Sequence, residues 1–304
     1  MSASLLDAHA TAARLPYPRL VHELRALLAD ASVQVPPRIV QPLAGGASLF
    51  VMPAADARVA MAKLITFTPA NAGTPRAAIQ GDVVVFDVAT GERRLVLDGP
   101  TVTARRTAAV SALAAQALAP DAKGPLLVVG AGAQGRAHCE AFIEVLGVRE
   151  VVIASRSASS AQALAAHARA LGARATTVAD PASAPCPLIV TCTPANGVVL
   201  RSLPRGDVFI AAVGAFTPHM VELGAELCRE CAAHGRVVVD TPEAVHEAGD
   251  LIQAGLEVAS FPTLRDVLDA RPGARGPVLF KSCGWAGWDL AAARVALRAT
   301  PSAA

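Results

Sequence analysis

The fold is decided by one stretch of the chain, which reads Leu126-Leu127-Val128-Val129-Gly130-Ala131-Gly132-Ala133-Gln134-Gly135. Its first four residues form an apolar run of β type, and a helical pattern begins after Gly135. In this context Gly130 permits a tight turn, Gly132 lets a pyrophosphate approach the backbone, and Gly135 allows the helix to pack closely on the strand. The following helix N-terminus attracts the anion. The stretch therefore predicts a dinucleotide-binding Rossmann domain.

Strand and helix patterns alternate on the C-terminal side of this turn. Strands are predicted at 151–154, 188–191, 208–213 and 236–239, and helices at 137–146 and 161–171. Such alternation is typical of a parallel, doubly wound sheet. The fold class is therefore α/β for this part of the chain.

The end of the second strand indicates which dinucleotide is bound. An NAD-binding domain usually carries an Asp or Glu here for the ribose 2′-hydroxyl. This chain instead has Ser155, Arg156 and Ser157. A guanidinium and hydroxyl groups suit a phosphate, although an arginine at a strand end is also common as a solvated cation. We expect NADPH to be preferred, with NADH possible.

The first hundred residues have a different pattern. A helix is predicted over 18–29, followed by short β-type runs at 38–40, 48–51, 59–67, 83–88 and 94–97. Short connections between consecutive strands indicate a mostly antiparallel sheet. A long helix over 103–118 leads into the second lobe. Periodicity alone does not assign 278–280 and the helix predicted at 288–299 to either lobe.

Composition excludes several classes of protein. The 304 residues carry a net charge of +2 without any basic block, so nucleic acid is not an expected partner. No apolar run approaches the roughly 20 residues that span a bilayer, and no secretory signal is recognisable, so we expect a cytoplasmic protein without a membrane partner. The six cysteines are sparse and are expected to be reduced. Cys228, Cys231 and His234 lie in a helical pattern without a second cysteine pair, and no metal is expected.

Three cations lie in apolar or β-patterned sequence: Arg38, Lys63 and Arg106. A buried cation needs a partner, and an anionic substrate would provide one. Each of the three, taken alone, is more often a surface residue or a structural ion pair.

The chain resembles the ornithine cyclodeaminase and mu-crystallin family along nearly its whole length. The resemblance is carried by motifs that occur in the family's order, namely Met52-Pro53-Ala54, Lys63 in Ala-Lys-Leu-Ile-Thr, Thr103-x-x-Arg106-Thr107-Ala108-Ala109, the glycine-rich turn, Ala212-Val213-Gly214-Ala215-Phe216 and Phe280-Lys281-Ser282-x-Gly284. No single motif is specific, but their combination is.

The resemblance implies a Rossmann domain inserted into an α+β domain, usually in a homodimer. Residues 1–118, with 279–304 returning to them, would form the substrate and dimerisation domain, and residues 119–278 the dinucleotide-binding domain. Arg38, Lys63 and Arg106 would gather around a substrate carboxylate. Cofactor contacts are implied for Gln134, Thr193, Val213, Gly214 and Ser282, and less firmly for Thr107 and Gly81.

One departure from the family pattern selects an activity. Cyclodeaminases have an aspartate where this chain has Phe216, so the base for hydrolytic deamination is missing. This favours the ketimine reductase branch, in which NAD(P)H reduces Δ1-pyrroline-2-carboxylate to L-proline or Δ1-piperideine-2-carboxylate to L-pipecolate, with a role in proline metabolism. The alternatives are an alanine dehydrogenase or opine-type reductive aminase, an ornithine cyclodeaminase, and a mu-crystallin-like protein that binds NADPH and a small ligand.

Lys63 is the expected catalytic residue, because a neighbourhood of cations would lower its pKa and let it donate the imine proton. His138, His219 and His246 are weaker acid–base candidates, since histidines are more often packed or exposed than catalytic. Asp289 either orients a partner or belongs to a helix terminus or the surface.

Overall fold

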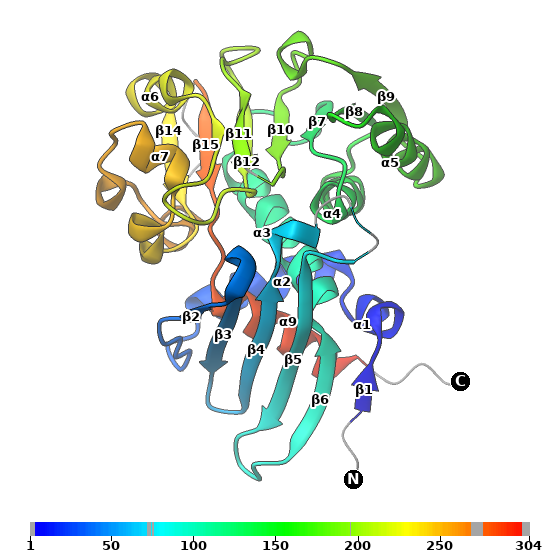
Figure 1. The fold of residues 1–304 in the computed structure, drawn as a ribbon, viewed down its shortest axis with the longest axis vertical. Helices are drawn as coiled ribbons and strands as arrows, with labels where there is room; N and C mark the ends of the chain where they lie inside the picture. Colours follow the sequence, from blue (N-terminus) through cyan, green and yellow to red (C-terminus); the bar gives the residue numbers. More distant parts are fainter. Residues whose placement is uncertain (1–3, 72–73, 75, 195, 269–275, 300–304) are drawn as a thin grey trace. The chain divides into compact units, whose positions relative to one another are not determined.

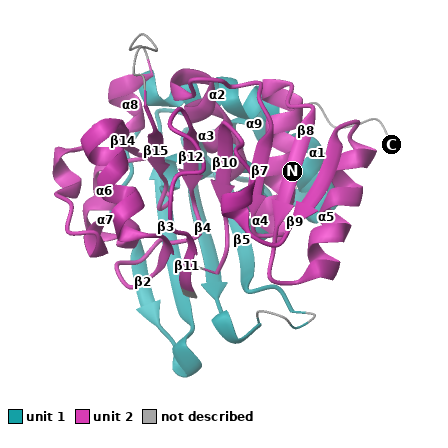
Figure 2. Cartoon of the chain, turned by 90° about the horizontal axis from the view of Figure 1, so that it is seen from above, with its two compact units in different colours: residues 1–106, 285–304 teal, residues 107–284 magenta. Residues whose placement is uncertain are grey.

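The computed structural model describes residues 4–71, 74, 76–194, 196–268 and 276–299. The chain divides into two compact units, which Figure 2 colours separately. Unit 1 comprises residues 1–106 and 285–304, and unit 2 comprises residues 107–284.

Unit 1 contains a six-stranded sheet in the order β1-β6-β5-β4-β3-β2 (Figure 1). Its strands are β1 (Ser4–Leu6), β2 (Ile39–Pro42), β3 (Ser48–Ala55), β4 (Val59–Phe67), β5 (Ile79–Asp87) and β6 (Arg93–Asp98). The pairs from β2 to β6 are antiparallel, and only the short β1 runs parallel to its neighbour β6. The mostly antiparallel sheet predicted from the short connections is confirmed.

Helices cover one face of this sheet. They are α1 (Ala8–Arg14), α2 (Tyr17–Ala29) and α9 (Ala286–Arg298), which is the red helix behind the strands in Figure 1. Helix α9 contacts α2, β3 and β4, and almost all of its residues are buried. Alternate strand residues form the core beneath it, including Phe50, Met61, Ile65, Val83 and Leu97.

Unit 2 is built on a seven-stranded sheet in the order β14-β15-β12-β10-β7-β8-β9. All of its strand pairs are parallel, which confirms the doubly wound sheet. The strands are β7 (Leu126–Val129), β8 (Glu150–Ala154), β9 (Arg174–Val178), β10 (Leu188–Thr191), β12 (Phe209–Ala212), β14 (Arg236–Val239) and β15 (Val278–Lys281). A separate parallel pair is formed by β11 (Asn196–Leu200) and β13 (Val221–Leu223).

The helices of unit 2 connect these strands. They are α4 (Ala133–Ala141), which a π-helical turn at Phe142–Leu146 extends, α5 (Ala158–Ala170), α6 (Ala225–His234), α7 (Gly249–Gln253) and α8 (Leu264–Val267). Both units also contain short 3-10 turns, at Ala44–Gly46 and Pro69–Asn71 in unit 1 and at Pro181–Ser183, Pro242–His246 and Val258–Ser260 in unit 2. Helix α3 (Gly99–Leu118) contains the boundary between the two units.

The unit boundaries differ from those that the resemblance implies. The resemblance places them after residues 118 and 278, whereas the compact units divide after Arg106 and Gly284. Strand β15 pairs with both β12 and β14, so residues 278–281 belong to the parallel sheet. Only α9 returns to the first unit.

Two further features concern membrane-spanning helices and the cysteines. In the described part of the chain, no helix has the length and apolar character to cross a membrane. All six cysteines are buried free thiols, and burial raises the pKa of Cys228 and Cys231 to about 12. The structure places both in α6, and no group of three potential metal ligands occurs among the described residues.

Candidate active site

Lys63 is a buried lysine in the middle of β4. Side chains alternate between the faces of a strand, so Lys63 shares the helix-covered face with Met61 and Ile65, and its exposed fraction is only 1%. Lysine is almost never fully buried without a partner. An apolar alternation interrupted by one lysine is therefore a signal of a specific buried site.

The partner of Lys63 is Asp289 in the first turn of α9. The Asp289 carboxylate lies 2.7 Å from Lys63 Nζ and 3.1 Å from Arg106 Nε, and it is completely buried. Arg106 reaches it from α3 and is itself 5% exposed. One carboxylate therefore serves two cations, which leaves a net positive charge on the group.

The pKa of Lys63 is lowered to about 8, mainly by burial. The positive charges of Arg106 and Arg38 contribute to this lowering, and the ion pair with Asp289 opposes it. Arg38 lies over the Phe50 ring at 5.5 Å from its centroid. The structure thus brings the three cations singled out in the sequence into one neighbourhood and adds Asp289, which orients Lys63 and Arg106.

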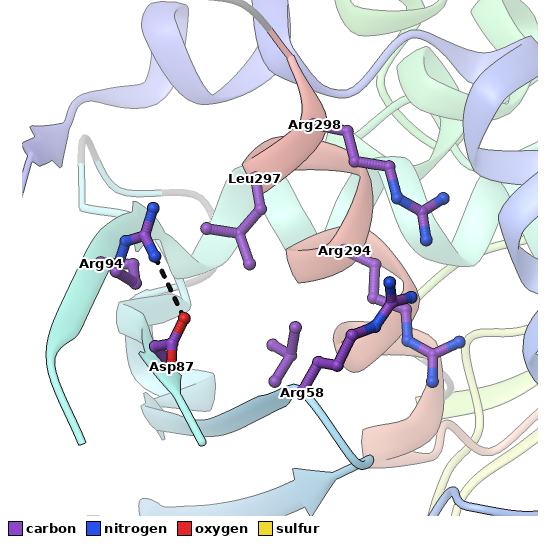
Figure 3. Close-up of a pocket in the computed structure, with 7 residues that line it drawn as sticks. Arg58, Asp87, Arg94, Arg294, Leu297 and Arg298 are labelled. Carbon is purple, nitrogen blue, oxygen red and sulfur yellow. Dashed lines mark hydrogen bonds and ion pairs between the residues drawn. The ribbon is translucent and has the colours of Figure 1, made fainter. Parts of the chain in front are cut away.

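A second charged group on α9 contains more carboxylates than cations. Arg294 contacts three carboxylates, at 2.6 Å for Asp56, 2.7 Å for Asp30 and 3.3 Å for Glu23, and Arg298 also pairs with Glu23. Figure 3 shows the pocket beside this group, lined by Arg58, Val59, Asp87, Arg94, Arg294, Leu297 and Arg298. It contains none of the residues that the sequence predicts for catalysis.

The glycine-rich turn of unit 2 has the geometry of a phosphate site. Gly130 has φ of +117°, and a Cβ there would lie 2.7 Å from the Cys192 carbonyl oxygen. A Cβ on Gly135 would lie 2.1 Å from the Gly130 oxygen, whereas one on Gly132 would meet open space. The buried side-chain oxygen of Gln134 has no hydrogen-bond partner in the described structure. Open backbone and an unused acceptor at a helix N-terminus fit a bound dinucleotide, and Ala133 is the first residue of that helix.

The strand end at β8 presents hydroxyl groups and one exposed guanidinium. Ser157 caps α5 by accepting a hydrogen bond from the Ser160 N–H, and its hydroxyl also contacts those of Ser159 and Ser160. Ser155 accepts a hydrogen bond from the Ser157 N–H. Arg156 is exposed. Thus no carboxylate occupies this strand end, and the α5 N-terminus begins directly beside it.

Two buried carboxylates, which the sequence analysis missed, organise the carboxyl ends of the parallel strands. Glu222 accepts hydrogen bonds from residues that include the predicted cofactor residues Thr193 and Gly214. Asp240 accepts hydrogen bonds from the Ser282 hydroxyl at 2.9 Å and from the N–H groups of Cys283 and Gly284. A Glu within the apolar run Val221–Leu223 was the available signal.

The three histidines considered as acid–base candidates differ in burial. His138 is fully buried, with Nδ1 at 2.8 Å from the Gln134 carbonyl oxygen and Nε2 at 3.0 Å from the Ser111 hydroxyl. Burial lowers the pKa of His138 to about 4, so it stays neutral and serves as a link between helices. His219 and His246 are exposed.

The two weaker cofactor candidates, Gly81 and Thr107, and the candidates Val213 and Phe216 are placed as follows. Gly81 has φ of +130°, and a Cβ there would lie 2.1 Å from the Leu64 carbonyl oxygen, so close strand packing requires the glycine. Thr107 is buried in α3, and Val213 is half-buried, donating its N–H to the Thr191 carbonyl oxygen. Phe216 packs against the apolar core of unit 2, so no carboxylate stands at that position.

A doubly wound parallel sheet with a glycine-rich phosphate turn, in one chain with a buried cation group, defines a two-unit dinucleotide-binding protein. Residues 15–300 match the model of the ornithine cyclodeaminase/mu-crystallin family. The chain belongs to this family.

Three individual proteins are similar to this chain over nearly its whole length. The chain is 40% identical to Delta(1)-pyrroline-2-carboxylate reductase 2 of Burkholderia ambifaria, over 95% of this chain and 94% of the relative. It is 39% identical to the Delta(1)-pyrroline-2-carboxylate/Delta(1)-piperideine-2-carboxylate reductase of Azospirillum brasilense, over 96% and 94%. The fold matches Thermococcus litoralis Delta(1)-pyrroline-2-carboxylate reductase, solved with NADH and L-proline, with a TM-score of 0.83 and 23% identity over 96% and 93% of the two chains.

Proposed function

We propose that this chain is a ketimine reductase that uses NAD(P)H to reduce a cyclic imino acid. The substrates are Δ1-pyrroline-2-carboxylate, which gives L-proline, and Δ1-piperideine-2-carboxylate, which gives L-pipecolate. The observation that carries the proposal is the buried group of Lys63 and Arg106 on the single carboxylate of Asp289. Its positive excess suits a small carboxylate substrate, and relatives that share about two fifths of the sequence are named for this reaction.

Each residue of this group has a distinct role in the proposal. Arg106 and Arg38 bind the substrate carboxylate and so fix the position of the imine carbon. Asp289 holds Lys63 and Arg106 in place from within the core. The nicotinamide, when bound, supplies the hydride. Lys63 Nζ, with its pKa lowered to about 8 by burial, donates the proton that the imine nitrogen gains.

NADPH is the preferred cofactor in this proposal. The residues assigned to it are Gly130, Gly132, Ala133, Gln134, Gly135, Ser155, Arg156, Ser157, Thr193, Val213, Gly214 and Ser282. A 2′-phosphate would meet the exposed Arg156 and the serine hydroxyls at the α5 N-terminus, and no acidic side chain there would repel it. NADH lacks this phosphate and would bind more weakly.

The protein is further proposed to act as a homodimer in the cytoplasm. The sheet face of unit 1 opposite α9 carries Pro53, Ala62, Val84 and Val96 in one row across four strands. Leu64 on the same face is 48% exposed. An apolar face of this extent suits burial against a second copy, and the buried free thiols suit a reducing compartment.

The test is to follow NADPH oxidation with each cyclic imine, with pyruvate plus ammonia, with pyruvate plus an amine, and without substrate. Rapid oxidation with an imine is the expected result. Turnover confined to pyruvate with ammonia or an amine would instead identify an alanine dehydrogenase or opine-type reductive aminase. Tight binding without turnover of any substrate would identify a binding protein of the mu-crystallin type. Ammonia release from ornithine would identify a cyclodeaminase, despite Phe216.

A further inference from the structure

The carboxylate of Glu222 connects the ends of two strands of the parallel sheet. Its Oε1 accepts hydrogen bonds from the Thr193 N–H at 2.6 Å and the Thr193 hydroxyl at 2.8 Å. Its Oε2 accepts from the Gly214 N–H at 2.7 Å and the Thr191 hydroxyl at 3.0 Å. Thr191 ends β10, and Thr193 and Gly214 lie in the turns that follow β10 and β12.

The four donors around Glu222 favour its ionised form, although burial raises its pKa. Each carboxylate oxygen faces one backbone N–H, which cannot act as an acceptor. An amide would place a hydrogen against one of these N–H groups, because its nitrogen cannot accept. Hydrogen bonds to a charged group are also the stronger ones. The side chain is fully buried, so water does not compete for these donors.

A second set of contacts fixes Glu222 itself. The Asp250 Oδ1 atom accepts hydrogen bonds from the backbone N–H groups of Glu222 and Leu223, at 2.6 and 2.9 Å. The Asp250 Oδ2 atom lies 2.7 Å from Lys281 Nζ, which also donates to the Ala215 carbonyl oxygen at 2.6 Å. The β12 turn is therefore held at two successive residues, Gly214 and Ala215.

The space around Gly214 shows how closely this turn approaches the carboxylate. A Cβ on Gly214 would lie 2.5 Å from Glu222 Cδ and Oε1, and 2.3 Å from the Thr193 carbonyl oxygen. Any side chain at this position would separate the two turns. The close approach of Gly214 to the Thr193 carbonyl oxygen is a contact between backbone atoms, and the Glu222 carboxylate lies directly beside it.

We propose that Glu222 is a positioning residue for the cofactor: by holding the turns after β10 and β12 together, it sets the orientation of Thr193 and Gly214 towards the bound dinucleotide. The inference rests on the proposed cofactor contacts of these two residues. Glu222 has no free acceptor for the cofactor, because both of its oxygens are already occupied by the protein. It acts through the two turns.

The test is the dissociation constant for NADPH, measured by calorimetric titration without substrate, together with the melting temperature. Glu222→Gln is expected to weaken NADPH binding at least about tenfold, because its amide opposes one backbone N–H in either orientation. Glu226→Gln is the matched control, since Glu226 is an exposed carboxylate that pairs with Arg229. The control is expected to bind NADPH like the wild type.

A pair of variants at Thr191 isolates one hydrogen bond. Thr191→Val keeps the shape of the side chain and loses the hydroxyl that donates to Glu222, so a rise of about threefold in the dissociation constant is expected. Thr191→Ser keeps the hydroxyl and should bind NADPH like the wild type. A structural role alone would lower the melting temperature in both variants and leave the affinity of the folded protein unchanged.

These measurements decide between a positioning role and a purely structural role for Glu222. An unchanged dissociation constant in a folded Glu222→Gln variant overturns the inference. If that variant does not fold, the Thr191 pair decides, and equal affinities for the Val and Ser variants overturn the inference. A wild-type protein that binds NADPH but reduces no cyclic imine contradicts the proposed function, and the role of Glu222 is still decided by these affinities.

Discussion

Two charged groups lie along helix α9. One contains more cations than carboxylates, and the other contains more carboxylates than cations. Near its start, the single carboxylate of Asp289 holds the two cations Lys63 and Arg106. Near its end, the guanidinium of Arg294 is held by the three carboxylates of Glu23, Asp30 and Asp56. The second group is a structural anchor, because its cation is fully compensated within the unit. The first has positive charge in excess, which in the proposed function is balanced by the substrate carboxylate.

The largest expected effect comes from removing a cation of the Asp289 group. Arg106→Ala should lower kcat/KM for the imine by a factor of about 10² to 10⁴, the range that follows from losing a buried charged contact to the substrate. Steady-state assays of NADPH oxidation measure this loss. The dissociation constant for NADPH should stay within about twofold of the wild-type value, because Arg106 binds substrate in the proposal.

A mild effect of Arg106→Ala on kcat/KM would make the Asp289 group a second structural anchor. Unfolding in urea provides the control, since Asp289 keeps Lys63 as a partner in this variant and the protein should remain folded.

The opposite result is expected for Arg294. Arg294→Ala leaves three carboxylates near one another without their shared cation, and breaking a buried ion pair in this way costs about 3–5 kcal/mol. The free energy of unfolding should fall by that amount, while kcat/KM of the folded protein stays unchanged. Arg58→Ala is the matched control, because Arg58 is exposed in the same pocket. A loss of activity in folded Arg294→Ala protein would contradict the contrast between the two groups.

The pH dependence of activity tests Lys63 as the proton donor. Burial lowers the pKa of Lys63 to about 8, and the donor is active in its protonated form, which predominates below that pH. kcat/KM should therefore be constant below about pH 8 and fall about tenfold per unit above it.

Lys63→Arg separates this titration from that of the substrate. Arginine stays protonated throughout the accessible range, so the fall near pH 8 should disappear in this variant, although its activity is low. A fall that persists unchanged would assign the titration to the imine itself.

The smallest expected effect concerns the cofactor. Arg156→Ala should raise KM for NADPH about tenfold and leave KM for NADH unchanged, because only NADPH carries the 2′-phosphate that the guanidinium would bind. Equal changes for the two cofactors would show that Arg156 does not recognise the phosphate.

Much of the fold was predictable because its signals are local. The strand predicted at 59–67 and that at 126–129 coincide with β4 and β7, since apolar runs bounded by turn residues specify strands directly. Strand β15 was harder to assign, because its pairing with β12 and β14 depends on segments far away in the chain. The unit boundary after Gly284 follows from that pairing.

The candidate site was predictable only in part. Lys63 interrupts an apolar alternation and so attracts attention in the sequence. Glu222 is marked only by its two apolar neighbours and Asp240 not at all, because an acidic residue near a strand end is usually a surface residue. Their importance appears only when several N–H and hydroxyl donors converge on each of them.

The sequence by itself determined the dinucleotide turn, the parallel sheet and the three cations, because glycine spacing, apolar periodicity and a charge in a buried pattern are local properties. The tertiary structure decided which carboxylate pairs with which cation. Asp289 meets Arg106 across 183 residues of chain, and no local pattern specifies such a contact. Packing of α9 against the sheet brings them together, and the low polarity of that core lowers the pKa of Lys63.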